Sequence, residues 1–288
     1  MKEKEMNPTV TVLGSGCPIP TLERSGPAFA LDIGTDISMI DCGPGALKQM
    51  MVAGLDVARS TKVFITHHHS DHTFDLGQFA LGGWTLGRRA LHIYGPSGTE
   101  RIAHLWFEEM LGADIAYRAG LGRPTGGLID IGSTDCGPGH IFENDEMTVT
   151  AAHGVHTTED LAYRFDVGGR SIVFTGDTAP TDDIADLARG ADVLFHESNL
   201  VPTARDAYAK TEGGLAVWES LQDHHTPPEK AGEIAQKAGV RQLVLIHFLP
   251  GADPRVAEEL ASSTFDGPVV AAEDLMRVEV GDEIMIHR

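Results

Sequence analysis

Cysteine is scarce in this chain of 288 residues, and long apolar runs are missing from it. The three cysteines, Cys17, Cys42 and Cys136, are widely spaced and form no C-x-x-C pair. The sequence therefore predicts neither a disulfide framework nor a thiolate zinc site, and we expect a reducing cytoplasm as its compartment. No apolar run could span a membrane, and Met1 to Glu5 lack the apolar stretch of a signal peptide, so we expect no membrane partner.

Positive charge is the second shortage. The chain has 22 Lys and Arg residues against 42 Asp and Glu residues, which gives a net charge of −20. Proteins that bind nucleic acid use Lys and Arg to neutralise phosphates. The charge therefore predicts a small-molecule substrate and argues against a nucleic-acid partner, although a bound pair of divalent cations would add positive charge at one place.

The apolar segments fall into two groups of strands, each accompanied by helices. We expect strands at 9–13, 28–33, 37–41, 63–66, 91–94, 147–151, 161–166, 171–174, 193–195 and 243–246, and helices at 46–53, 73–80, 181–188 and 228–238. This order predicts an α/β fold with two stacked sheets and helices outside, in one domain over 1–288 with halves of about 1–145 and 146–288. Segments 120–140 and 200–223 have no clear period, and we interpret them as a loop near the site, a lid, a dimer contact or a surface excursion.

The segment Thr66 to His72, with the sequence T-H-H-H-S-D-H, is the strongest functional signal. It places four histidines and an aspartate directly after an apolar strand. Such a stretch has little value in a core, whereas neutral imidazole and carboxylate are ligands that suit Zn, Mn or Fe. The sequence therefore predicts a metalloenzyme whose remaining ligands lie further along the chain.

Three later residues occupy the same position at the end of a strong apolar strand. They are His153, Asp177 and His247. Loops at strand ends gather along one edge of a layered fold, so we expect these side chains to complete the site. Either His153 or His156 could be the ligand of its segment, and we favour His153 because it follows the strand directly.

These motifs together resemble the metallo-β-lactamase superfamily, and the resemblance covers nearly the whole chain. It implies the four-layer αβ/βα sandwich, with two mixed sheets and a dinuclear site between them. It also implies that one ion is held by His67, His69 and His153, the second by Asp71, His72 and His247, and that Asp177 bridges both. The ions would be two divalent metals, foremost Zn²⁺, with Mn²⁺ or Fe as alternatives. His68 lies between ligands and should point away from them.

Other motifs are similar to the RNase Z and arylsulfatase-like branch of that superfamily. They include Ala162-Tyr163-Arg164, Phe195-His196-Glu197 and His224-His225-Thr226. By this resemblance Asp71, His224 and Glu197 are the catalytic residues, with His224 as the general acid and Glu197 orienting it. The alternative is that His224 or His225 only caps the helix that starts near Pro228.

The resulting hypothesis is a zinc-dependent hydrolase of a small ester, phosphodiester, sulfate ester or lactone that acts through a metal-bound hydroxide. The alternatives are an RNase Z-type endoribonuclease of tRNA 3′ processing, a hydrolytic aromatic dehalogenase, and a non-catalytic binding module on the same fold. Candidate pocket walls are Phe74, Trp84, Phe248 and the turn Ser25-Gly26-Pro27. A homodimer is also compatible with the sequence.

Overall fold

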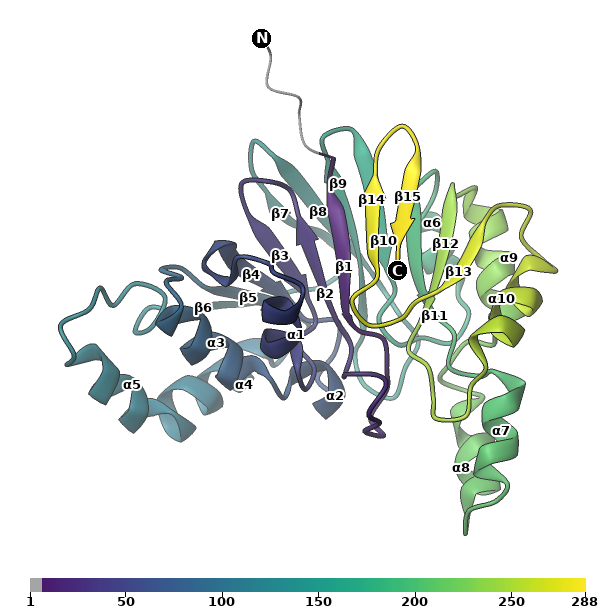
Figure 1. Cartoon of the computed structure of the whole chain (residues 1–288), viewed down its shortest axis with the longest axis horizontal. Coiled ribbons are helices and arrows are strands. Elements are labelled where there is room, and N and C mark those ends of the chain that lie inside the picture. Colours follow the sequence, from purple (N-terminus) through teal and green to yellow (C-terminus); the bar gives the residue numbers. More distant parts are fainter. Residues whose placement is uncertain (1–6) are drawn as a thin grey trace.

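The computed structural model of the chain describes residues 7–288 and contains two facing β-sheets between layers of helices (Figure 1). The first sheet has the strand order β15-β14-β1-β2-β3-β4-β5-β6, and the second has the order β13-β12-β11-β10-β9-β8-β7. The strands of the first sheet are β1 (Thr9–Gly14), β2 (Ala28–Asp32), β3 (Ile37–Ile40), β4 (Ser60–Phe64), β5 (His92–Gly95), β6 (Gly132–Asp135), β14 (Arg277–Val280) and β15 (Ile284–His287). Those of the second are β7 (Gly139–Glu143), β8 (Met147–His153), β9 (Leu161–Val167), β10 (Arg170–Phe174), β11 (Val193–Glu197), β12 (Gln242–Ile246) and β13 (Val269–Ala271).

The core between the sheets explains why these segments are strands. Alternate residues of β1 and β9, among them Val10, Val12, Tyr163 and Phe165, enter one apolar cluster with Phe174 of β10. β10 to β13 run parallel and are buried on both faces, so β11 and β12 have no exposed residue in their sequences.

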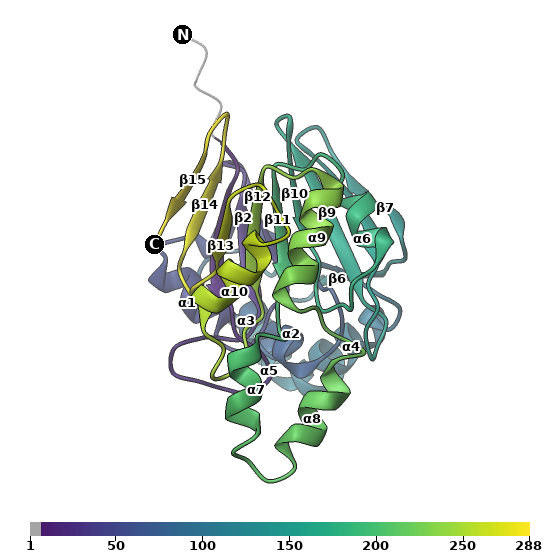
Figure 2. The same ribbon diagram turned by 90° about the vertical axis from the view of Figure 1, so that its right-hand side faces the viewer.

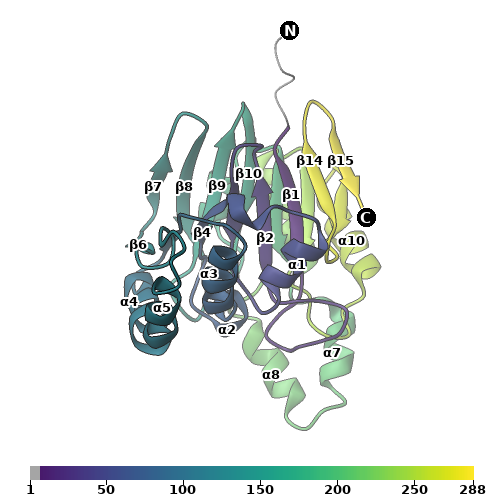
Figure 3. The same cartoon turned by 60° about the vertical axis from the view of Figure 1, so that its left-hand side comes forward.

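Helices cover the outer face of each sheet, those of the first sheet being visible in Figure 3 and those of the second in Figure 2. The first sheet is covered by α1 (Ala46–Val52) and α3 (Leu76–Thr85), with α4 (Thr99–His104), the π-helical segment η2 (Leu105–Met110) and α5 (Gly112–Ala119) beside them. The second is covered by α6 (Asp182–Leu187), α9 (Pro228–Ala238) and α10 (Pro254–Ser262). The short helices η1 (Val57–Arg59) and α2 (Ser70–Thr73) flank β4.

The structure contains elements that the sequence expectation lacks, among them α4, η2, α5, α10 and β13, and three further segments also differ from it. The hairpin β14–β15 pairs with β1, so the C-terminal residues join the sheet of the first half. Segment 120–140 contributes the edge strand β6 and the start of β7. Segment 200–223 forms the helices α7 (Pro202–Tyr208) and α8 (Gly214–Leu221), which extend away from both sheets (Figure 2).

Within residues 7–288, no helix is both long and apolar enough to cross a membrane. Met1 to Glu5, in which we predict no signal peptide, lie outside the described residues.

Candidate metal centre

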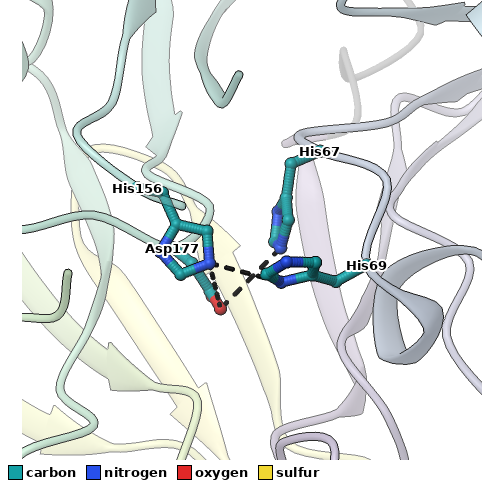
Figure 4. A group of neighbouring side chains, drawn as sticks. All are labelled: His67, His69, His156 and Asp177. Carbon is teal, nitrogen blue, oxygen red and sulfur yellow. Dashed lines mark hydrogen bonds and ion pairs between the residues drawn. The ribbon is translucent and has the colours of Figure 1, made fainter. Parts of the chain in front are cut away.

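The histidine-rich segment meets three later loops at one edge of the stacked sheets. The chain leaves β4 extended, which places His67 and His69, and then turns into α2, which carries Asp71 and His72. β8, β10 and β12 end nearby and are followed by His156, Asp177 and His247. Figure 4 shows His67, His69, His156 and Asp177 pointing toward one another.

The first group of candidate ligands is His67, His69, His156 and Asp177. One ligand atom from each lies within 4.8 Å of the others. His156 Nε2 lies 3.3 Å from His69 Nδ1, and Asp177 Oδ2 lies 3.9 Å from the Nε2 atoms of both His67 and His156. These separations leave room for one ion at the centre of the group, since metal–ligand bonds of about 2 Å place ligand atoms about 3 Å or more apart.

The second group is Asp71, His72 and His247. Asp71 Oδ2 lies 3.4 Å from the Nε2 atoms of both histidines. Asp177 also borders this group, because its Oδ2 lies 3.2 Å from His247 Nε2 and its Oδ1 lies 3.5 Å from His72 Nε2. The Asp177 carboxylate therefore stands between the two groups.

Each imidazole turns one nitrogen to an outer partner and the other to the centre. Asp160 Oδ2 lies 3.1 Å from His67 Nδ1, and Asp41 Oδ2 lies 2.7 Å from His72 Nδ1. The other three rings also have an outer partner. His247 Nδ1 lies 2.9 Å from the side-chain amide nitrogen of Asn199, His156 Nδ1 lies 3.1 Å from the carbonyl oxygen of His224, and His69 Nε2 lies 3.2 Å from Thr157 Oγ1. Outer partners of this kind fix ring orientation in metal sites.

The inward-facing atoms fit a pair of cations better than they fit each other. His67 Nε2, His72 Nε2 and Asp177 Oδ1 are buried and have no hydrogen-bond partner among residues 7–288. Four aspartates are also buried in this region, namely Asp41, Asp71, Asp160 and Asp177. Buried polar atoms are normally paired and buried charges compensated, so this donor set suits divalent metals.

The pKa shifts lead to the same conclusion. Burial lowers the pKa of His67 well below its ordinary value and also lowers the pKa of His156, which favours the neutral imidazole that binds metal. Burial alone would lower the pKa of His72 as well, but Asp41 and the other nearby carboxylates raise it well above its ordinary value. The carboxylates thus create a field at His72 that favours positive charge, which a metal ion would also satisfy.

The backbone is strained where it presents these groups. Asp41 and His247 have φ values of 57° and 63°, in the left-handed region that non-glycine residues rarely adopt. Gly176, just before Asp177, has a φ of 62°, and a Cβ there would lie 2.5 Å from Asp160 Oδ2. Strain of this kind persists where the surrounding structure enforces it, and it is common at functional sites.

The structure corrects the choice between His153 and His156. His153 is the last residue of β8, pairs with Leu161 of β9 and is exposed. His156 occupies the position in the cluster that we predict for His153. The strand runs to His153, so the chain needs three further residues to reach the centre.

The histidine beside Glu197 also differs from the expectation, which places His224 there. His224 is only partly buried and offers its carbonyl to His156, whereas His225 is buried and faces Asp177 and His247. Glu197 Oε1 lies 2.8 Å from Nδ1 of His225. Burial alone would lower the pKa of His225, but the charge of Glu197 and this hydrogen bond raise it to about 9.

Some residues of the site were not found by sequence reasoning. Asp160 and Asn199 carry no spacing signal, and only the folded chain brings them to His67 and His247. His68 turns away from the cluster and lies 2.8 Å from Thr99 Oγ1 at the start of α4.

Two cavities open beside the cluster. The larger, of about 460 Å³, is bounded by His69, His156, His225 and His247 and by apolar residues that include Ile19, Tyr208, Val217, Leu221 and Leu249. The smaller, of about 390 Å³, is bounded by Asp71, Ser70, Arg24 and Phe74. Trp84 and Phe248, which we predict as pocket walls, are buried in apolar clusters and line neither cavity.

Comparison with known families gives a match over most of the chain. The family model described as a beta-lactamase superfamily domain matches residues 38–248. Ribonuclease Z of Mycobacterium bovis (strain BCG / Pasteur 1173P2) is 32% identical over 286 residues, covering 94% of this chain and 98% of that protein. Ribonuclease Z of Mycobacterium tuberculosis (strain ATCC 25618 / H37Rv) is 30% identical, with coverages of 94% and 97%.

Solved structures of the same architecture confirm the fold that the sequence predicts. The metallo-beta-lactamase fold protein YhfI from Bacillus subtilis superposes with a TM-score of 0.71 and 22% identity, covering 94% of this chain and 98% of that chain. The short form of human tRNase Z has a TM-score of 0.70 and 23% identity, with coverages of 95% and 99%.

Proposed function

Because this chain belongs to the β-lactamase superfamily of metal-dependent hydrolases, and within it to the ribonuclease Z branch, we propose that it is a dinuclear endoribonuclease that cuts a 3′-extended RNA. The cluster of His67, His69, His156, Asp71, His72, His247 and Asp177 is the observation that carries the proposal. The ribonuclease names of relatives that match almost the full chain support RNA as the substrate class.

The proposal replaces our sequence-based expectation of a small-molecule substrate and of no nucleic-acid partner, which the ribonuclease relatives contradict. The expectation rests on a net charge of −20, which is a sum over the whole chain. Charges separated by more than about 10 Å are largely screened at 0.1 M salt, so distant surface carboxylates have little effect at the site. The local field there depends on the ligand cluster and its cations.

In this proposal His67, His69, His156 and Asp177 would hold one divalent cation. Asp71, His72 and His247 would hold a second, and the Asp177 carboxylate also lies close to this group. Zn²⁺ is the foremost candidate because imidazole and carboxylate suit it. When bound, a pair of such ions polarises the phosphodiester and lowers the pKa of water. Asp160, Asp41 and Asn199 keep the histidine rings in the binding orientation.

His225 is the residue placed to assist departure of the leaving oxygen. Its Nδ1 is held by Glu197, which leaves Nε2 facing Asp177 and His247 at the floor of the larger cavity. A proton on Nε2 can therefore be delivered to an oxygen that leaves from a phosphate bound at the cluster. Glu197 is a positioning residue in this scheme, since it touches His225 and not the substrate.

The test is cleavage of a 3′-extended tRNA precursor by the purified protein with added Zn²⁺ or Mn²⁺. We expect a single cut near the end of the acceptor stem that EDTA abolishes and added metal restores. Asp177→Ala should remove both cleavage and bound metal, measured by elemental analysis.

His225→Ala and His224→Ala form a matched pair for the general acid. His225→Ala should lower kcat roughly 10²- to 10⁴-fold, the usual contribution of a general acid, while His224→Ala should have a much smaller effect. A precursor left intact by the metal-loaded wild type at low salt would refute the proposal.

A further inference from the structure

Phe74 is an aromatic side chain exposed beside the candidate metal centre. Its exposure is 63%, and it follows α2 directly, three residues after Asp71. Residues three apart on a helical turn lie on the same side, and both Phe74 and Asp71 line the smaller cavity. A group bound next to Asp71 would therefore meet the ring of Phe74.

The position of Phe74 distinguishes it from other exposed apolar residues. Single apolar side chains are common on protein surfaces and need no special explanation. Met285, for example, is 43% exposed on the edge strand β15 and lines neither cavity. Phe74 instead forms a wall of a cavity of about 390 Å³ that holds a candidate metal ligand, and this volume lies in the usual range for small-ligand sites.

Basic side chains are nearly missing from the walls of both cavities. Among the described residues that line them, Arg24 is the only Lys or Arg. One nitrogen of its guanidinium already donates to Ser15 Oγ and to the Ala272 carbonyl, and the group stacks 4.6 Å from the centre of the Phe248 ring. Within these two cavities, Lys and Arg could therefore make few contacts to an RNA backbone, which gives contacts to bases more weight.

We propose that Phe74 is a stacking platform for a nucleobase next to the scissile phosphate, a specificity contact that rests on the ribonuclease function proposed above. A flat aromatic ring offers its face to any base, and such stacking needs no charged partner. The phosphate would lie at the cluster, with one neighbouring nucleoside in the Phe74 cavity.

The test combines Phe74→Ala with RNA that lacks a single base. On an intact 3′-extended RNA stem-loop, Phe74→Ala should lower kcat/KM roughly 5- to 150-fold, the range for losing one base–aromatic stack, mainly through a higher KM. An abasic residue is then placed on one or the other side of the cleaved bond. With the abasic residue at one of these two positions, wild type and Phe74→Ala should have the same kcat/KM, because the base that would stack on Phe74 is already missing.

Control variants separate stacking from a general structural effect. Phe74→Trp should keep most of the kcat/KM of the wild type, and Met285→Ala, also an exposed apolar residue, should behave as wild type. Metal content and thermal midpoint of Phe74→Ala should match the wild type, because the side chain is mostly exposed. An equal ratio of wild-type to Phe74→Ala kcat/KM on intact RNA and on both abasic RNAs would overturn the inference. A wild type that cuts no RNA would instead overturn the proposed function itself.

Discussion

Glu197→Gln is the most informative single substitution, because the two side chains have the same shape and differ at one atom. Glu197 is fully buried and accepts four contacts. Its Oε1 receives the Thr178 amide at 3.0 Å and faces His225 Nδ1 at 2.8 Å, and its Oε2 receives the amides of Asn199 at 3.0 Å and Thr226 at 3.2 Å. A glutamine keeps one acceptor oxygen and replaces the other with an NH2 donor.

The cost depends on which way the new amide points. With NH2 toward Asn199 and Thr226, two backbone N–H groups lose their acceptor. With the NH2 group toward Thr178 and His225, only the Thr178 N–H loses its acceptor, because the His225 imidazole can change tautomer and accept a hydrogen bond from the new amide. The second orientation is therefore favoured, and one unsatisfied buried donor costs about 1–3 kcal/mol. For a chain of this size, each kcal/mol of lost stability lowers the midpoint of thermal unfolding by about 2–4 °C, so that midpoint should fall by roughly 2–12 °C.

The same substitution should slow RNA cleavage. A neutral glutamine cannot stabilise a positively charged His225, so the general-acid contribution of about 10²–10⁴ should be partly or wholly lost. Calorimetry gives the midpoint and steady-state kinetics give kcat. Glu233→Gln is the matched control, because Glu233 is exposed and, among residues 7–288, forms an ion pair only with Lys230. Unchanged stability and rate in Glu197→Gln would refute the role of Glu197 as a buried positioning residue.

Three further outcomes test the centre itself. His156→Ala should lower the metal content of the purified protein, whereas His153→Ala should not, and elemental analysis would show the reverse if His153 were the ligand. Asp160→Ala should weaken metal affinity about 10- to 100-fold, as loss of an outer partner usually does, and a chelator competition that finds no change would contradict its role at His67. Gly176→Ala should destabilise the fold by more than about 1 kcal/mol, because alanine disfavours the local φ of 62° and its Cβ would collide with Asp160, and an unaltered urea midpoint would argue against that geometry.

Much of the candidate site could be predicted because its chemistry is local in sequence. His67, His69, Asp71 and His72 lie within six positions after a strand, so an extended segment followed by one helical turn brings them together. Asp177 and His247 could be added because strand ends collect at one edge of a layered fold. Of the second half, β8 to β12 and the helices α6 and α9 could likewise be predicted from apolar periodicity, whereas α7, α8, α10 and β13 to β15 could not.

The errors arose where the register of a loop decides the result. His153 and His156 are three residues apart, and only the pairing of β8 with β9 shows that the strand includes His153. His224 and His225 are adjacent, and the path of the chain just before α9 decides which of them contacts Glu197. Such choices cannot be made from residue types, because both members of each pair have the same chemistry.

The sequence by itself determined the metal-dependent class, the layered fold and most of the candidate ligand residues, because these depend on residue type and on periodicity along the chain. Tertiary structure alone decided that His156 and not His153 joins the cluster, and that Asp160 and Asn199 contact the rings of His67 and His247. It also decided that Phe74, unlike Trp84 and Phe248, lines a cavity beside the cluster. These contacts join residues far apart in the chain. The physical reason is that ring orientation, burial and local field depend on distances in space, which residue order does not specify.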